Sequence, residues 1–231
     1  MFNERVLKHA PWSVSKADLA ALCGRQYAMK YVLKKKEGKK STESRVGVVA
    51  HQILECKLRD PVVDVHAKLA ELTTSEVLTT GEVQELNDRL SSIEDFQRRI
   101  AKFKAKNCTL PEVNKELIEH KLAMSSEFGP ASFFVPTDNL MRGVMDYALI
   151  TDDNIMLVID HKTGRKKNIK DHSTQFYAYM LLVMANFPVD GVQCAVNYVG
   201  DDKLVWFPRE NGDMGAWNRA DVGKLRIWLA D

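Results

Sequence analysis

The chain has 231 residues, of which 45% are hydrophobic and 28% charged, and its formal net charge is +2. This length fits one domain, or one domain with an elaborated insertion, and the composition is ordinary for a globular protein. The sequence has no apolar stretch long enough to span a bilayer and no signal-peptide core, so we expect no membrane segment and an intracellular, cytoplasmic location. The near-neutral total charge says little about nucleic acid as a partner; only local basic clusters bear on it.

The four cysteines are far apart in the sequence and include no Cys-x-x-Cys pair. Without a secretory signal, such thiols are expected to be reduced and structural. They are Cys23, Cys56, Cys108 and Cys194.

The first half of the chain predicts helices. A first helix is expected over about 15–33, because Ser15 followed by Asp18 resembles a capping box and apolar residues then recur at helical spacing. A basic loop broken by glycine follows over 34–40, and a helical insertion of two or three helices is expected beside the core over about 60–110. Between them, a second helix is expected from about Thr42, with a buried side formed by Val46, Val49, Ala50, Ile53 and Leu54.

The second half predicts a sheet. Strands are expected over 117–124, 140–150 and 155–160, with 151–154 as a hairpin turn. Residues 155–159 of the third strand are all apolar, as expected of a central strand covered on both faces. The elements expected after it are a helix from Asp171 to Ala185, strands over 192–199 and 203–207, and an amphipathic helix over 217–229. This order predicts an α/β fold in a single domain, with a central mixed sheet flanked by helices.

An aspartate and a lysine end the apolar third strand, in the run Val-Ile-Asp-His-Lys-Thr-Gly over 158–164. Side chains alternate along a strand, so Asp160 and Lys162 point to one face and His161 to the other. One interpretation is a divalent cation on Asp160 with Lys162 beside an attacking water. The other, which is the commoner outcome for this pattern alone, is an ion pair at a strand end.

Asp146 strengthens the metal interpretation. Around the 151–154 turn, antiparallel pairing brings two residues opposite each other when their residue numbers add up to about 305 or 306. This places Asp146 near Asp160. Two carboxylates at that distance repel unless a cation lies between them, and oxygen ligands favour Mg²⁺ or Mn²⁺. The interpretation requires that both carboxylates point to the same region.

Two helices offer further polar pairs. His51 and Glu55 lie four residues apart on the second helix, and Gly47 one turn earlier allows a close approach to another backbone. Gln175 and Tyr179 have the same spacing on the later helix, where an amide and a phenol can bind a substrate phosphate or orient the lysine. The alternatives are a half-buried histidine with a solvated glutamate, and a tyrosine packed in the core.

In this order, the motifs resemble the RecB-like nucleases of the PD-(D/E)XK superfamily, which include the RecB and AddB nuclease domains and the CRISPR-adaptation nucleases. The resemblance covers most of the chain apart from the 60–110 insertion and the C-terminal tail. It is carried by residues 47–55, 143–146, 158–164 and 175–179, and also by the start over 13–27 and the acidic strand at 119–122.

The resemblance implies a restriction-endonuclease-like core with a metal site. The implied ligands of Mg²⁺ or Mn²⁺ are His51, Asp146, Asp160 and the main-chain carbonyl of His161. The implied catalytic residues are Lys162 with Asp160 and Asp146, then Gln175 and Tyr179, and more weakly Glu55. Iron–sulfur members of the family carry a compact cysteine trio near the C-terminus; Cys194 alone lies late in this chain, so no cluster is expected.

The function implied is a metal-dependent DNA nuclease, either an exonuclease or a single-strand endonuclease, acting in recombination, repair or replication. The compact size without a motor suggests a stand-alone nuclease, for which an origin in a virus such as a phage, or in a mobile element, is one option. Its partners can be a second copy of the chain, in a homo-oligomer, or a recombination or replication protein. An RNA-directed nuclease is a further alternative. The alternative from another class is an inactive DNA-binding or assembly protein that retains the fold, although the intact Asp146, Asp160 and Lys162 argue against it.

Two basic runs are candidates for contacts with DNA phosphates. One is the 34–40 loop with Lys35 and Lys36, and the other lies directly beyond the third strand. Its members are Arg165, Lys166, Lys167 and Lys170. Charge runs are often only solvated loops, but the position of the second run favours it, and either would make binding sensitive to salt.

Overall fold

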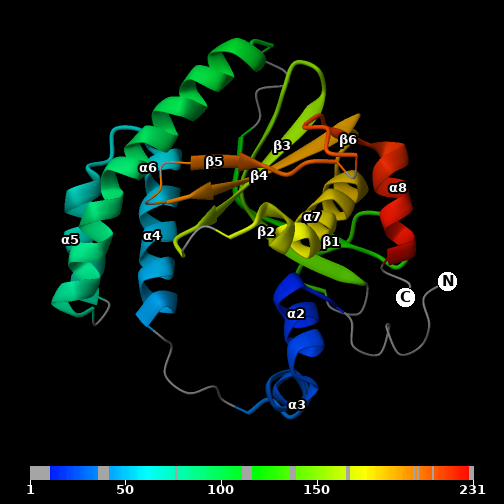
Figure 1. Cartoon of the computed structure of the whole chain (residues 1–231), viewed down its shortest axis with the longest axis horizontal. Coiled ribbons are helices and arrows are strands. Elements are labelled where there is room, and N and C mark those ends of the chain that lie inside the picture. The colour runs from blue at the N-terminus through cyan, green and yellow to red at the C-terminus, as the bar shows by residue number, and fades with distance from the viewer. Residues whose placement is uncertain are drawn as a thin grey trace.

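A mixed β-sheet lies between two groups of helices, with α4, α5 and α6 on one face and α7 and α8 on the other (Figure 1). The predicted α/β fold with a central mixed sheet flanked by helices is therefore confirmed. The computed structural model describes residues 11–35, 42–75, 78–110, 116–135, 139–164, 167–199, 201, 203–209 and 211–228.

The sheet has the strand order β1-β2-β3-β4-β5, and β6 pairs with β4. Only β3 and β4 run parallel among these pairs, and α7 connects them on one face of the sheet. The strands are β1 Glu116–Met124, β2 Met141–Ile150, β3 Ile155–Lys162, β4 Gly191–Tyr198, β5 Lys203–Trp206 and β6 Trp217–Asn218.

Strand β3 is the central strand that its apolar sequence predicts. Every residue from Met156 to His161 is buried, because both faces of the strand are covered by helices. Tyr147 of β2 pairs with Ile159 of β3, and their numbers sum to 306, which confirms the predicted register. In the connecting turn Asn154 has a φ of +56°, a left-handed conformation that asparagine tolerates better than most residues.

Helices α4, α5 and α6 cover one face of the sheet. Helix α4 is Thr42–Arg59, and the five residues predicted for its buried side are all buried. Helices α5 (Val65–Ser75) and α6 (Thr80–Asn107) are the two helices of the predicted insertion. They do not lie merely beside the core, since Leu86, Phe96 and Ile100 share a buried cluster with the sheet residues Tyr147 and Ile159.

The first predicted helix is broken into three pieces, so the prediction of one helix over 15–33 is wrong. Helix α2 (Val14–Leu22) ends at Cys23, which is extended, and α3 (Gly24–Tyr27) and the π-helix η1 (Ala28–Val32) follow. The N-cap is Ser13 rather than Ser15, and its side chain makes no capping hydrogen bond. Helical periodicity does not reveal this break; after it, Tyr27 stacks on Trp12 with ring centroids 6.1 Å apart.

Two later boundaries also differ from the prediction. Asp171 lies inside a 3₁₀ helix, η3 (Ile169–His172), whose cap is Asn168, and α7 begins only at Ser173 and ends at Asn186. Trp217 is not helical but pairs in β6, because its ring is buried and stacked on Phe207; α8 is Arg219–Trp228.

Among the described helices, none combines the length and the apolar character that crossing a bilayer requires. All four cysteines are described and unpaired.

Candidate metal centre

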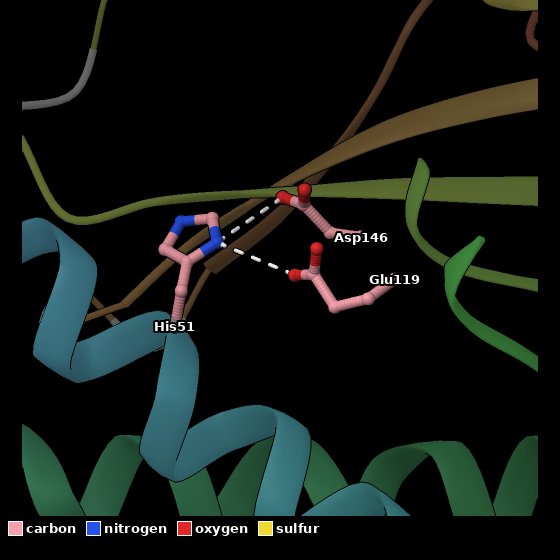
Figure 2. Close-up of side chains that lie close together, drawn as sticks. All are labelled: His51, Glu119 and Asp146. Atoms are coloured by element: carbon pink, nitrogen blue, oxygen red, sulfur yellow. Dashed lines mark ion pairs between the residues drawn. The ribbon is translucent and has the colours of Figure 1, made fainter. Parts of the chain in front are cut away.

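Three side chains from three different elements converge at one edge of the sheet (Figure 2). His51 comes from α4, Glu119 from β1 and Asp146 from β2, and one ligand atom of each lies within 4.8 Å of the others. Nδ1 of His51 is 3.7 Å from Oδ2 of Asp146 and 3.9 Å from Oε1 of Glu119. All three side chains are partly exposed, so an ion can reach them from solvent.

The pairing of β1 with β2 places the two carboxylates together. Ile118 pairs with Tyr147 and His120 with Met145, so Glu119 lies opposite Asp146. Glu119 has a φ of +48°, the left-handed region that costs a non-glycine residue about 1–3 kcal/mol. Because of this local turn, Ile118 and Glu119 both face the α4 side of the sheet instead of alternating. Backbone strain at a cluster of charged side chains indicates a functional constraint.

The charges around Asp146 favour a bound cation. Burial, and next the charge of Asp160, raise the pKa of Asp146 to about 7, although the main-chain N–H of His161 donates to its Oδ2 at 2.7 Å. Burial alone would lower the pKa of His51, but a hydrogen bond with Glu119 and the charges of Asp146 and Asp160 outweigh it, and the pKa is raised. The two carboxylates bring negative charge that a divalent cation would neutralise, and the imidazole supplies a nitrogen ligand for the same ion.

Asp160 and Lys162 lie on the other face of the sheet, as strand alternation predicts. Asp160 is only 2% exposed, and its Oδ2 lies 2.7 Å from Nζ of Lys162, so the ion pair at the strand end is present. His161 points the opposite way and packs edge-on against Phe96, with ring centroids 4.8 Å apart. Lys162 stays partly exposed to solvent.

The expectation that both carboxylates point to the same region is not met: Asp146 and Asp160 are adjacent in register, but only Asp146 joins the group of converging ligand atoms. Asp146 turns toward His51 on the α4 side, whereas Asp160 turns toward α7. His161 connects the two sides: its N–H donates to Asp146, and its carbonyl oxygen lies 2.9 Å from Nε2 of His51. The carbonyl that the resemblance implies as a ligand is thus in contact with the implied histidine ligand.

Helix α7 supplies Gln175 and Tyr179, which hold Asp160. Gln175 donates from Nε2 to Oδ1 of Asp160 at 2.6 Å, and the phenol of Tyr179 lies 3.3 Å from the same oxygen. The phenol also contacts the carbonyl of Val144 at 3.0 Å. Tyr179 is buried as well, so it is both a core residue and part of the polar network. Gly143 allows the helix to lie this close, since a Cβ there would be 2.9 Å from Leu182.

Glu55 is not brought into contact with the three converging side chains. Its carboxylate accepts from Arg59 at 2.9 Å, and Arg59 also donates to the carbonyl of Ile118 at 3.0 Å, next to Glu119. Gly47 does allow a close approach, although to a side chain rather than to backbone: a Cβ there would lie 3.2 Å from Oγ1 of Thr163.

Part of each basic run can be placed. Lys35, Lys167 and Lys170 are exposed, whereas Lys36, Arg165 and Lys166 lie outside the described residues. Lys167 lines a pocket of about 320 Å³ together with Lys162, His172 and Gln175. Lys167 of the second basic run therefore reaches the pocket beside the strand-end lysine, and Lys35 of the first follows the N-terminal helices.

Glu119 was not predicted as a site residue, although it begins the acidic segment at 119–122. The missing signal was the register of β1 on β2, because residues 125–140 separate the two strands and no tight turn fixes their pairing.

A family model described as the PD-(D/E)XK nuclease superfamily matches residues 11–214 of the chain. A search of the curated proteins finds none that matches.

Proposed function

The chain belongs to the PD-(D/E)XK nuclease superfamily, and from this premise we propose that it is a Mg²⁺- or Mn²⁺-dependent deoxyribonuclease of the RecB-like group. The observation that carries the proposal is the convergence of His51, Glu119 and Asp146 beside the Asp160–Lys162 pair. The proposed substrate is DNA in recombination, repair or replication, cut from an end or within a single strand. Its proposed location is the cytoplasm, in keeping with four unpaired cysteines.

The proposed ion is held by His51, Asp146 and the newly found Glu119. Asp160 and the carbonyl of His161 would complete the ligand set, which requires Asp160 to turn from Gln175 toward Asp146. A divalent ion in such a site lowers the pKa of a bound water and neutralises charge on the phosphate. Hard oxygen donors with one imidazole suit Mg²⁺ and Mn²⁺.

The protein side chains position the reacting groups. Lys162 orients the attacking water and stabilises the negative charge that develops on the phosphate. Gln175 and Tyr179 act through Asp160, since both lie within hydrogen-bond distance of its Oδ1. Lys167 and Lys170 contact the DNA backbone beside the pocket, so binding weakens as salt rises.

A cleavage assay with Mg²⁺ and with Mn²⁺ tests the proposal. The wild type is expected to cut DNA, and Lys162→Ala and Asp160→Ala are expected to lose at least a hundredfold in rate while they remain folded. Arg98→Ala, in an exposed ion pair on α6, is the control and keeps full activity. Products from end-labelled linear and circular DNA distinguish cutting from ends and internal cutting. A wild type that binds DNA but leaves single-stranded DNA, duplex DNA and RNA intact would establish the inactive DNA-binding alternative instead.

A further inference from the structure

Two aromatic rings and two cations form a cluster at the surface of the hairpin of β1 and β2, with Phe134 and Lys121 exposed and Phe133 and Arg142 partly exposed. The rings of Phe133 and Phe134 are 5.4 Å apart and meet at 74°. Nζ of Lys121 lies 5.8 Å and 5.2 Å from their two centroids, and the guanidinium of Arg142 lies 5.3 Å from that of Phe133. Phe134 is 74% exposed, although a ring of this size is usually buried. We call these four residues the aromatic cluster.

The aromatic cluster lies on the same face of the sheet as the candidate metal centre. On β2, Met141 and Met145 belong to the core beneath α7, so Arg142 between them points to the opposite face. Asp146 also meets His51 on that opposite face. Arg142 precedes Asp146 by four positions, which is about 13 Å along a strand.

Strand β1 gives the same orientation. Leu122 and Met124 belong to the core beneath α7, so Lys121 points to the face that carries Glu119. Lys121 is exposed and lies only two positions beyond Glu119. A strip of one sheet face therefore runs from the acidic centre to the aromatic cluster.

Exposed aromatic rings beside cations fit one class of ligand. Unpaired bases offer flat faces on which aromatic rings stack, whatever their sequence, and their phosphates attract lysine and arginine. Bases inside a duplex are already stacked on their neighbours and offer no such face. We propose that the aromatic cluster binds an unpaired stretch of the nucleic-acid substrate, a few nucleotides from the bond that is cut.

This inference rests on the proposed function and names the strand form of its substrate. Binding can be tested without cleavage by measuring fluorescence anisotropy in EDTA, with a labelled oligothymidylate and a blunt duplex as the two probes. Phe134→Ala is expected to weaken binding of the oligothymidylate about 5- to 150-fold, the range for loss of one stacked base, with less than about a twofold change for the duplex. Because its ring is exposed, Phe134 can be replaced without opening the core.

A matched control is Val62→Ala, which truncates an apolar side chain that is 89% exposed after α4 and should leave both affinities unchanged. Lys121→Ala is expected to reduce the slope of log affinity against log salt by about one for the oligothymidylate.

Failure of the inference is distinguishable from failure of the proposed function. The inference alone is overturned if the protein cleaves DNA but Phe134→Ala binds the oligothymidylate as tightly as the wild type does. It is also overturned if the variant loses affinity for the oligothymidylate and for the duplex equally. No measurable binding of the oligothymidylate by the wild type overturns it too. A protein inert in every cleavage assay that still loses single-strand binding on Phe134→Ala would retain the aromatic cluster as a binding site and lose the nuclease.

Discussion

Glu119 combines an unfavourable backbone conformation with a carboxylate placed opposite another carboxylate. Both features raise the free energy of the metal-free protein, and both are explained if the side chain binds a cation. The ionised form of Asp146 is also unfavourable in the metal-free protein, since its pKa is raised to about 7.

Glu119→Gln should weaken the binding of Mn²⁺ at least about tenfold, because it removes one anionic ligand while keeping the shape of the side chain. Isothermal titration calorimetry measures this without any need for catalysis. Glu127→Gln, at an exposed acid beyond the end of β1, is the control and should bind Mn²⁺ as the wild type does. Equal affinity in the wild type and in Glu119→Gln would show that Glu119 is not a ligand.

The metal-free protein should lose stability as pH rises through the range in which Asp146 ionises. The folded pKa of about 7 lies above the unfolded value of about 3.9, so the folded state holds a proton that the unfolded state has released. Between pH 5.5 and pH 8 the contribution of this group to the free energy of unfolding should fall by about 2 kcal/mol. The raised pKa of His51 acts in the same direction, because its stabilising proton is also lost as pH rises.

Urea unfolding in EDTA at several pH values, for the wild type and for Asp146→Asn, measures this difference. The variant should show the shallower dependence on pH. A dependence equally steep in both proteins would mean that Asp146 ionises normally.

Single residues could be predicted from the sequence where a short-range rule fixed them. The alternation along β3 placed Asp160 and Lys162 on one face, and the short turn after β2 fixed the register that brings Asp146 beside Asp160. The direction in which each carboxylate turns could not be predicted, because it depends on hydrogen-bond partners such as Gln175 that come from distant elements.

At the scale of elements, hydrogen bonds of Arg59 join α4 to β1 next to the candidate metal centre. Arg59 pairs with Glu55 and donates to the carbonyl of Ile118, the residue before the strained Glu119. The contact thus connects the helix that carries His51 to the strand that carries Glu119.

Arg59→Ala should weaken Mn²⁺ binding severalfold while it lowers the free energy of unfolding by less than about 1 kcal/mol, because the ion pair is exposed. Arg98→Ala removes a comparable exposed pair on α6 and should not alter Mn²⁺ binding. Calorimetric titration and thermal unfolding together separate the two effects. A loss of stability without any loss of Mn²⁺ affinity would leave the contact with a structural role only.

Gly143→Ala should destabilise the protein by about 1–3 kcal/mol, because the added methyl group would overpack against Leu182 of α7. Gly81→Ala, where the added group meets nothing within 4 Å at the start of α6, should be neutral or stabilising. Urea unfolding compares the two variants. If both alanines have the same effect, β2 and α7 are not as closely packed as the structure indicates.

Helices and strands with a clear pattern of apolar residues could be predicted from the sequence, but the residues at which several of them begin or end could not. The buried side of α4 and the apolar run of β3 are visible in the sequence. The break at Cys23, the 3₁₀ turn before α7 and the pairing of Trp217 depend on tertiary contacts, such as the stacking of Tyr27 on Trp12 and of Trp217 on Phe207.

At the scale of the molecule, the candidate metal centre lies on the face of the sheet that α4 covers, near the edge strand β1. Helix α4 contributes His51 and the two strands contribute the carboxylates, whereas Gln175 and Tyr179 of α7 hold Asp160 on the opposite face. A cation bound there would link α4 to the consecutive strands β1 and β2. In the sequence, α5 and α6 separate α4 from these strands.

Mn²⁺ should therefore stabilise the whole molecule, by about 2.7 kcal/mol at a free concentration of 100 times Kd. Thermal unfolding with Mn²⁺ and with EDTA measures the effect, and His51→Ala should abolish most of it. An unfolding temperature of the wild type that does not change with Mn²⁺ would exclude tight binding to the folded state.

The helices at 60–110 have a consequence for anyone who would shorten this protein. Phe96 of α6 touches the rings of both His161 and Tyr147, and Glu82 at the start of α6 accepts a 2.7 Å bond from Arg45 of α4. The segment therefore packs against strands β2 and β3 and is joined to α4, the helix that bears His51. Excising the segment to shorten the protein would leave α4 alone to cover this face and would expose part of it to water, so a trimmed version needs replacement apolar packing designed at the same time.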